Sequence, residues 1–140
     1  MKPRIKVITL AVSDLPRSLA FYRDGLGLAT EGIIGTEFED GAVAFFNMNE
    51  DLILALWPKR SLVKDAQIPV TPSSPSDFSL GHIVNSKQEV DAVMKQAERA
   101  GAKITAPAQD RFWGGYSGYF QDLDGHLWEI AWNPQWVVKE

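Results

Sequence analysis

The sequence predicts an α+β fold of two βαβββ modules, whose curved mixed sheets surround a cleft. Strand-like and helix-like segments follow one another in the same order twice along the 140 residues, which is typical of a duplicated unit. A stretch rich in proline and serine, residues 58–77, separates the two copies as a linker would. The copies are offset by 74 residues, the interval from Gly27 to Gly101, from Phe46 to Phe120 and from Leu54 to Trp128.

The first module begins with a β-branched and apolar strand over residues 5–12. Ser13 and Asp14 then form a helix-capping signal, and Pro16 suits the first helical turn. The helix that follows has one apolar face and ends at Gly25 and Gly27. That face carries Leu15, Leu19, Tyr22 and Leu26. Three strands complete the module, over residues 29–34, 42–48 and 52–57.

The second module repeats this order. A strand over residues 78–84 precedes a helix with an apolar face, which Gly101 ends. The face carries Val90, Val93, Met94 and Ala97, and further strands are expected over residues 102–105, 116–121 and 127–132. The linker holds at most a short helix around residues 62–66. We therefore expect one domain over residues 1–140, with module one over about 4–58, the linker over about 59–76 and module two over about 77–134.

Neither module has enough helix to cover both faces of its sheet. The uncovered faces and edges must pack against each other or against a second chain. We therefore expect a cleft between the sheets and a homodimer, and the sequence leaves open whether the modules pair within one chain or between chains.

Composition narrows the classes of partner. The formal net charge of −4 comes without any basic run, so the electrostatic footprint of a nucleic-acid binder is absent. No apolar stretch approaches the roughly 20 residues that span a bilayer. The first dozen residues alternate too regularly for a signal peptide, so we expect a cytoplasmic protein without a membrane partner. With no cysteine, only histidine, aspartate and glutamate remain as metal ligands, and the histidines are His82 and His126.

Several motifs occur in the order and spacing of a known family. They are Val12-Ser13-Asp14-Leu15, Phe21-Tyr22, Leu26-Gly27-Leu28, Gly81-His82-Ile83, Ala100-Gly101-Ala102 and Asp122-Leu123-Asp124-Gly125-His126 followed by Leu127-Trp128-Glu129. On these motifs the chain resembles the vicinal-oxygen-chelate (VOC) superfamily, which includes glyoxalase I, bleomycin- and fosfomycin-resistance proteins and extradiol dioxygenases. The resemblance covers roughly residues 5–134 and implies the glyoxalase fold. It also implies a metal site with one ligand from each of four strands, two in each module.

The metal positions that the resemblance implies are only half filled. In the second module they carry His82 and Glu129, whereas in the first they carry Val7 and Ala55, which cannot bind a metal. Two protein ligands hold a divalent ion only if water, substrate or a partner chain completes its shell. We therefore expect no cofactor, with a divalent metal on His82 and Glu129 as the alternative.

Glu129 is the most informative candidate for a catalytic role. Strand alternation puts it on one face with Leu127 and Ala131. A carboxylate buried there without a partner is unfavourable by several kcal/mol, and we expect His82 on the same inward face. The two side chains form either an acid–base pair or a purely structural hydrogen bond. His126 has the opposite parity, and we expect it at an exposed rim.

Four further residues are candidates for ligand binding. Trp113 and Tyr116 lie in a glycine-rich segment, where glycine allows close backbone approach and the rings offer flat apolar surfaces. Arg111 is suited to clamp an anionic group, although it is equally suited to a solvated loop. Trp57, at the end of an apolar strand of the first module, is the fourth candidate.

Three functions fit these features. The first is a glyoxalase/bleomycin-resistance-like protein that binds a small, planar or aromatic molecule in an apolar cleft, without the full family metal site. The second is a metal-dependent lyase or dioxygenase of the same superfamily. The third is a dimerising or partner-binding module, which an apolar patch near Trp132 and Trp136 would indicate. As an enzyme without metal, the chain would depend on acid–base catalysis by His82 and Glu129.

Overall fold

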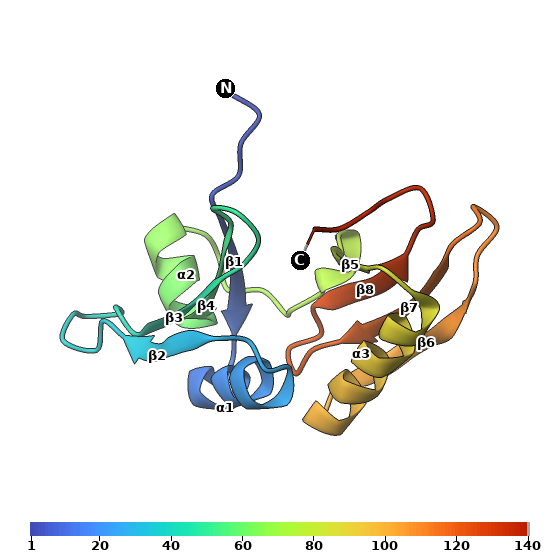
Figure 1. Ribbon diagram of the computed structural model, residues 1–140. Coiled ribbons are helices and arrows are strands. Elements are labelled where there is room, and N and C mark those ends of the chain that lie inside the picture. Colours follow the sequence, from blue (N-terminus) through green and yellow to red (C-terminus); the bar gives the residue numbers. More distant parts are fainter. Residues whose placement is uncertain (140) are drawn as a thin grey trace. The chain divides into compact units, whose positions relative to one another are not determined.

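The computed structural model describes residues 1–139, apart from the side chain of Ser76. It forms two compact units, Met1–Pro72 and the chain from Ser73 onward, each built on one four-stranded mixed sheet (Figure 1). The boundary falls inside the predicted linker, and each unit repeats the order βαβββ. The predicted α+β class and the two modules are therefore confirmed. A single domain over residues 1–140 and a cleft between the sheets stay predictions.

Unit 1 holds the first sheet in the order β1-β4-β3-β2. β1 and β4 are parallel and the other neighbours antiparallel, so the chain crosses over one face between β1 and β2. The elements are β1 (Val7–Val12), α1 (Leu15–Ala20), a π-helical turn (Phe21–Gly25), β2 (Thr30–Ile34), β3 (Val43–Asn47), β4 (Ile53–Pro58) and α2 (Lys59–Ala66).

The first helix begins and packs as its sequence predicts. The Asp14 carboxylate accepts a hydrogen bond from the Arg17 backbone N–H at 3.0 Å, which satisfies one of the free donors at the helix start. α1 then lies against one face of the sheet (Figure 1), and the side chains between them exclude water. This core comprises Leu10, Val12, Leu15, Leu19, Tyr22, Phe46, Leu54 and Leu56.

Unit 2 holds the second sheet in the order β5-β8-β7-β6, with β5 and β8 parallel. Ser86 caps its helix by accepting a hydrogen bond from the Glu89 N–H, and Gly101 ends the helix in the left-handed conformation at a φ of 108°. The elements are a 3-10 turn (Pro75–Asp77), β5 (Leu80–Val84), α3 (Lys87–Ala100), β6 (Lys103–Asp110), β7 (Tyr116–Gln121) and β8 (Leu127–Trp132).

The predicted bounds of β7 and β8 are confirmed, whereas β6 is longer than expected. It runs to Asp110 instead of ending at Thr105. Two register irregularities interrupt it, between Ile104 and Ala106 and between Ala106 and Gln109, and these break the regular alternation on which the prediction depended. β6 is an edge strand, which is where a sheet tolerates a residue such as Pro107.

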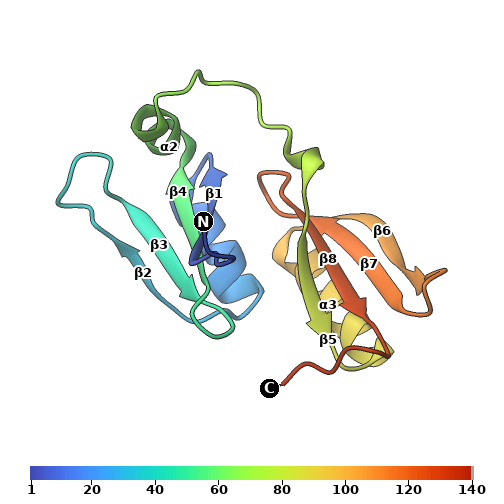
Figure 2. The same ribbon diagram turned by 90° about the horizontal axis from the view of Figure 1, so that it is seen from above.

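α1 covers one face of the first sheet and α3 covers one face of the second. The opposite face of each sheet is here called its open face. The strand pairs show which residues lie there, because directly paired residues of neighbouring strands share a face. In unit 1 the open face carries Val7, Thr9, Phe45, Asn47, Ile53, Ala55 and Trp57. In unit 2 it carries Ser117, Tyr119, Gln121, Leu127, Glu129 and Ala131, opposite the face that α3 covers (Figure 2).

Candidate functional site

A hollow of about 280 Å³ lies on the open face of unit 1. It is lined by Thr9, Gly41, Val43, Phe45, Ala55 and Trp57, and we name it the Trp57 hollow. All of these except Thr9 offer apolar surface. The Phe45 residue is 41% exposed, although a large aromatic side chain is ordinarily buried. A concave apolar surface with few polar groups is typical of a small-molecule site.

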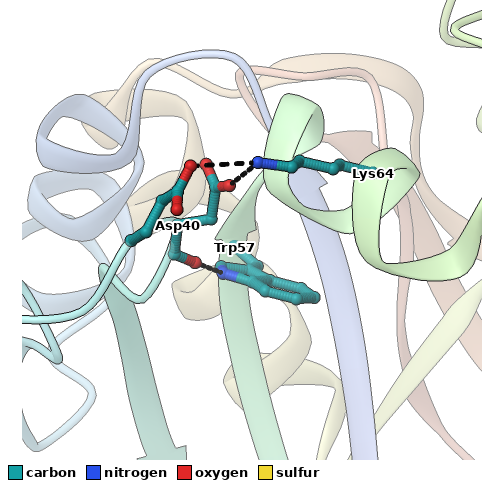
Figure 3. A network of polar contacts seen from close by, with 4 residues as sticks. Asp40, Trp57 and Lys64 are labelled. Carbon is teal, nitrogen blue, oxygen red and sulfur yellow. Dashed lines mark hydrogen bonds and ion pairs between the residues drawn. The ribbon is translucent and has the colours of Figure 1, made fainter.

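The indole of Trp57 has a defined orientation. Its Nε1–H donates a hydrogen bond to the carbonyl oxygen of Asp40 at 3.0 Å, which draws the ring toward the loop between β2 and β3 (Figure 3). That loop is tightly wound. A Cβ atom on Gly41 would lie 2.4 Å from the carbonyl oxygen of Gly35, so a side chain at this position would force the loop open. The loop therefore depends on glycine to bring Asp40 within reach of the indole.

Lys64 of α2 forms ion pairs with the loop between β2 and β3. Its ammonium group contacts the carboxylates of Asp40 at 2.9 Å and Glu39 at 3.2 Å (Figure 3). The hydrogen bond from Lys64 lowers the pKa of Asp40. Lys64 and Glu39 are exposed and Asp40 is partly exposed, and ion pairs in contact with solvent add little to stability. We therefore interpret the contacts as positioning the loop and, through it, Trp57.

The open face of unit 2 places Glu129 opposite Tyr119 across the strand pair β7·β8. Burial raises the pKa of Tyr119, and the negative charge of Glu129 and a hydrogen bond to it raise it further, whereas the charge of Arg111 lowers it. On the other side of Glu129 lies Gly81 of β5. A Cβ atom added to Gly81 would have no neighbouring atom within 4 Å, so the space above this residue is open. Glu129 therefore has a phenol as its neighbour on one side and free space on the other.

The expectation that His82 shares the inward face with Glu129 is wrong. In the parallel pair β5·β8, Glu129 is opposite Gly81, and His82 is opposite Ile130 of the core. Much of the His82 surface is accessible, yet the protein crowds the ring enough that desolvation lowers its pKa, while the charge of Glu89 on α3 acts in the opposite direction. His82 therefore lies on the α3 side and does not form an acid–base pair with Glu129.

The number of residues between the first strand and the helix cap already distinguishes the position of His82 from that of Val7. The position implied for the first-strand ligand, Val7, lies seven residues before the capping Asp14. Seven residues before the corresponding cap, Ser86, is Ser79, which has the same strand parity as Gly81. His82 is displaced from that parity by one residue.

Tyr116 is likewise not on the open face. Its hydroxyl group donates a hydrogen bond to Asp91 of α3 at 2.6 Å, and the Lys87 ammonium lies 5.5 Å from the centre of its ring. Trp113 lies in the turn between β6 and β7, with its ring directly against the backbone of Gly115. A ligand contact for Tyr116 at the open face is thus contradicted, whereas ligand binding by Trp113 stays a prediction.

His126 is buried, contrary to the exposed rim position expected for it. Its Nδ1 lies 2.6 Å from Asp122, whose side chain is fully shielded from solvent. The same carboxylate accepts hydrogen bonds from the backbone N–H groups of His126 at 2.8 Å and Asp124 at 3.0 Å. The turn between β7 and β8 brings these groups together, so His126 stabilises the hairpin.

Arg111 contacts the open face of unit 2 through Ser117. Its Nε–H donates to the hydroxyl oxygen of Ser117 at 2.9 Å and its Nη2–H to the carbonyl oxygen of Ser117 at 3.0 Å. The guanidinium carbon lies 5.7 Å from the centre of the Tyr119 ring, within the range of a cation–π contact. Arg111 is therefore a positioned residue rather than a solvated loop residue.

The residues of the open faces do not fit the metal site of the VOC superfamily. Val7 and Ala55 offer no donor atom, and His82 lies on the opposite face of its sheet from Glu129. Across the part of the chain that the structure describes, no three histidine, aspartate or glutamate side chains gather as a possible metal site. Glu129 is the single carboxylate among the paired residues of both open faces.

Sequence reasoning did not single out Phe45 or Ser117, and it left Tyr119 open between the pocket and the core. The turn at Leu123–Gly125 could have placed Ser117 and Tyr119 on the face of Glu129. An antiparallel hairpin closed by this turn pairs Tyr119 with Glu129 and Ser117 with Ala131. Phe45 has no such signal, since an aromatic residue in a short apolar strand fits either face.

Comparisons with known proteins agree with this fold. The family model described as Glyoxalase/Bleomycin resistance protein/Dioxygenase superfamily matches residues 4–130. A solved glyoxalase-related enzyme from Fulvimarina pelagi is 36% identical, with a TM-score of 0.86 over 99% of this chain and 94% of that one. No protein with curated annotation matches the chain. No helix among residues 1–139 has both the length and the apolar character needed to cross a membrane.

Two more distant structures share the fold. A lactoylglutathione lyase from Agrobacterium tumefaciens is 22% identical, with a TM-score of 0.68 over 98% of both chains. A fosfomycin resistance protein from Listeria monocytogenes is also 22% identical, with a TM-score of 0.69 over 95% of both chains. At this identity the likeness concerns the fold alone.

Proposed function

The chain belongs to the glyoxalase/bleomycin resistance protein/dioxygenase superfamily, and on this premise we propose that it binds a small planar or aromatic molecule at the Trp57 hollow. The observation that carries the proposal is the Trp57 indole, which the Asp40 carbonyl orients beside an apolar hollow of about 280 Å³. Binding itself is the function proposed, without a chemical step.

The lining favours a flat ligand over a polar or branched one. Trp57 and Phe45 present aromatic surfaces, and Val43 and Ala55 add aliphatic surface between the strands. Aromatic pairs contribute about 0.5–1.5 kcal/mol beyond the burial of their area. Thr9 is the one side chain of the lining with a hydroxyl group, so most of the affinity must come from apolar contact.

Binding is tested by the indole N–H resonances of the five tryptophans. We expect neutral 2-naphthol to shift the Trp57 resonance saturably, because a ring bound in the hollow changes the environment of the hydrogen bond to Asp40. Its saturated analogue, decahydro-2-naphthol, has a similar outline without a flat face, and we expect it to bind more weakly. Trp136, which is 58% exposed, supplies an internal control whose resonance stays in place.

Matched variants identify the site. Trp57→Phe assigns the resonance and removes the donor, and Phe45→Ala is expected to weaken 2-naphthol binding about three- to tenfold. Trp136→Phe is expected to leave the affinity unchanged. If the Trp57 resonance stays in place while other indole resonances shift, the ligand binds elsewhere and the proposal fails.

We also propose that the chain functions without the family's metal ion, because the paired strand residues of the open faces include Glu129 as the single carboxylate and no histidine. In a calorimetric titration of the chelator-treated protein with Ni²⁺, Zn²⁺ and Mn²⁺, we expect no stoichiometric binding of micromolar affinity or tighter. Stoichiometric binding that disappears in Glu129→Gln would contradict this proposal and favour a metal-dependent lyase or dioxygenase.

The homodimer expected from the sequence is part of the same proposal. It is supported by the exposed apolar side chains on the unit 1 open face, among them Val7 and Phe45, which a second sheet would cover. The patch near Trp132 and Trp136 gives weaker support for a separate partner-binding role, because the Lys87 ammonium lies over the Trp132 ring.

A further inference from the structure

We propose that Arg111 is the centre of an anion-binding site on the open face of unit 2, which takes the carboxylate group of a small ligand. The site lies wholly within this unit, so the inference does not depend on the Trp57 hollow. Three observations carry it: the guanidinium group is held in place, no carboxylate among residues 1–139 pairs with its charge, and the residue is partly exposed on this face.

The first observation is the fixed orientation of Arg111. Ser117 accepts hydrogen bonds from Nε–H with its hydroxyl oxygen and from Nη2–H with its carbonyl oxygen, at 2.9 Å and 3.0 Å. Ser117 is 0% exposed, so its oxygen atoms are part of the rigid sheet. The flat guanidinium is placed before a ligand arrives, which reduces the entropy lost on binding.

The second observation concerns the donors and the charge that remain. A guanidinium has five N–H donors, and Ser117 accepts two of them. Within residues 1–139, the other donors have no protein acceptor, and no carboxylate lies within ion-pair distance of Arg111. By contrast, Lys64 and Lys87 each contact a carboxylate. The free edge of a guanidinium matches the two oxygens of a carboxylate, which it binds bidentately.

The third observation is the setting of Arg111 on the face. The Tyr119 ring lies beneath the guanidinium, and Gln109, which is paired with Ser117 across the strands, is exposed beside it and offers an amide donor. Glu129 lies on the next strand, beyond Tyr119. A second negative charge on the ligand would be repelled there, so we infer a monocarboxylate whose other end is neutral or donates a hydrogen bond.

The test compares benzoate with neutral benzyl alcohol and with isophthalate, which has two carboxylates. In the wild-type protein we expect benzoate to shift the Arg111 Nε–H resonance saturably and isophthalate to bind more weakly. Arg111→Gln is expected to weaken benzoate binding at least about tenfold and to leave benzyl alcohol unaffected. Arg111→Lys keeps the positive charge but lacks the paired N–H donors of the guanidinium group, and it is expected to bind benzoate with intermediate affinity.

Arg99→Gln is the matched control, since it removes one positive charge from the exposed end of α3 in the same unit. We expect benzoate to bind this variant as it binds the wild type. Unchanged benzoate affinity in Arg111→Gln, or an Arg111 resonance that does not move in the wild type, would overturn the proposal. The 2-naphthol shift of Trp57 is measured on the same samples, so failure at Arg111 is distinguished from failure of the proposed function.

Discussion

Replacing Asp122 by alanine is expected to lower the free energy of unfolding by about 3 kcal/mol. The carboxylate of Asp122 is fully shielded from solvent and accepts three hydrogen bonds within its own turn. Two come from backbone N–H groups, of Asp124 and His126, and the third from the His126 imidazole. Alanine leaves these donors buried without their acceptor.

The size of this effect follows from charge and burial together. A hydrogen bond to a charged group contributes about 1.5–3 kcal/mol, and an unsatisfied buried donor is unfavourable by about 1–3 kcal/mol. The three bonds share one acceptor, so their contributions do not add fully. The turn also keeps the backbone hydrogen bond from Asp122 N–H to the His126 carbonyl, which alanine preserves. About 3 kcal/mol is therefore the net expectation.

Urea denaturation followed by tryptophan fluorescence measures the change. Asp110→Ala supplies the comparison, because Asp110 is an exposed carboxylate in the same unit that pairs with Lys87. Its replacement is expected to lower the free energy of unfolding by about 0.5 kcal/mol. Asp122→Asn keeps one acceptor oxygen and is expected to fall between the two. Equal losses for Asp122→Ala and Asp110→Ala would show that the buried network does not stabilise the hairpin.

Replacing Phe46 by alanine is expected to lower the free energy of unfolding by about 4 kcal/mol. The Phe46 side chain is 0% exposed, and the centre of its ring lies 5.9 Å from that of Tyr22, which is also fully buried. Alanine removes the ring between β3 and α1. The backbone on both sides is held by the sheet, so the resulting cavity collapses only in part.

The same experiment tests whether the chain is one domain. Phe120 occupies the corresponding position in unit 2 and is 1% exposed, so Phe120→Ala is the matched variant. If residues 1–140 unfold as one domain, each substitution lowers hydrogen-exchange protection in all eight strands and leaves a single denaturation transition. Faster exchange confined to β1–β4 in Phe46→Ala would contradict the prediction of a single domain.

Local chemistry made most of the fold predictable. Asp14 and Ser86 each cap a helix with a side-chain oxygen, and Gly101 ends the second helix because its left-handed conformation favours glycine. Each of these interactions joins residues that are close in sequence, so the sequence alone is enough to predict them. The order of strands also followed, because the 74-residue offset shows that whatever one module forms the other repeats.

The site was less predictable, because a shift of one residue turns every side chain of a strand to the opposite face. The resemblance of the Gly81-His82-Ile83 motif implied that His82 shares the face of Glu129. The observed register pairs Glu129 with Gly81 instead. This agrees with the interval between the helix caps Asp14 and Ser86, which is 72 residues rather than 74. The error therefore lay in the first strand of module two.

By itself, the sequence determined the elements, their order, the duplicated module and the one carboxylate that an inward-facing strand position would carry. Only the tertiary structure decided which side chains meet: Tyr119 beside Glu129, Ser117 beneath Arg111, and the Asp40 carbonyl on the Trp57 indole. The physical reason is that helix caps and hydrophobic periodicity act over a few residues along the chain. Strand register and loop closure depend on hydrogen bonds between segments far apart in sequence, which no local pattern specifies.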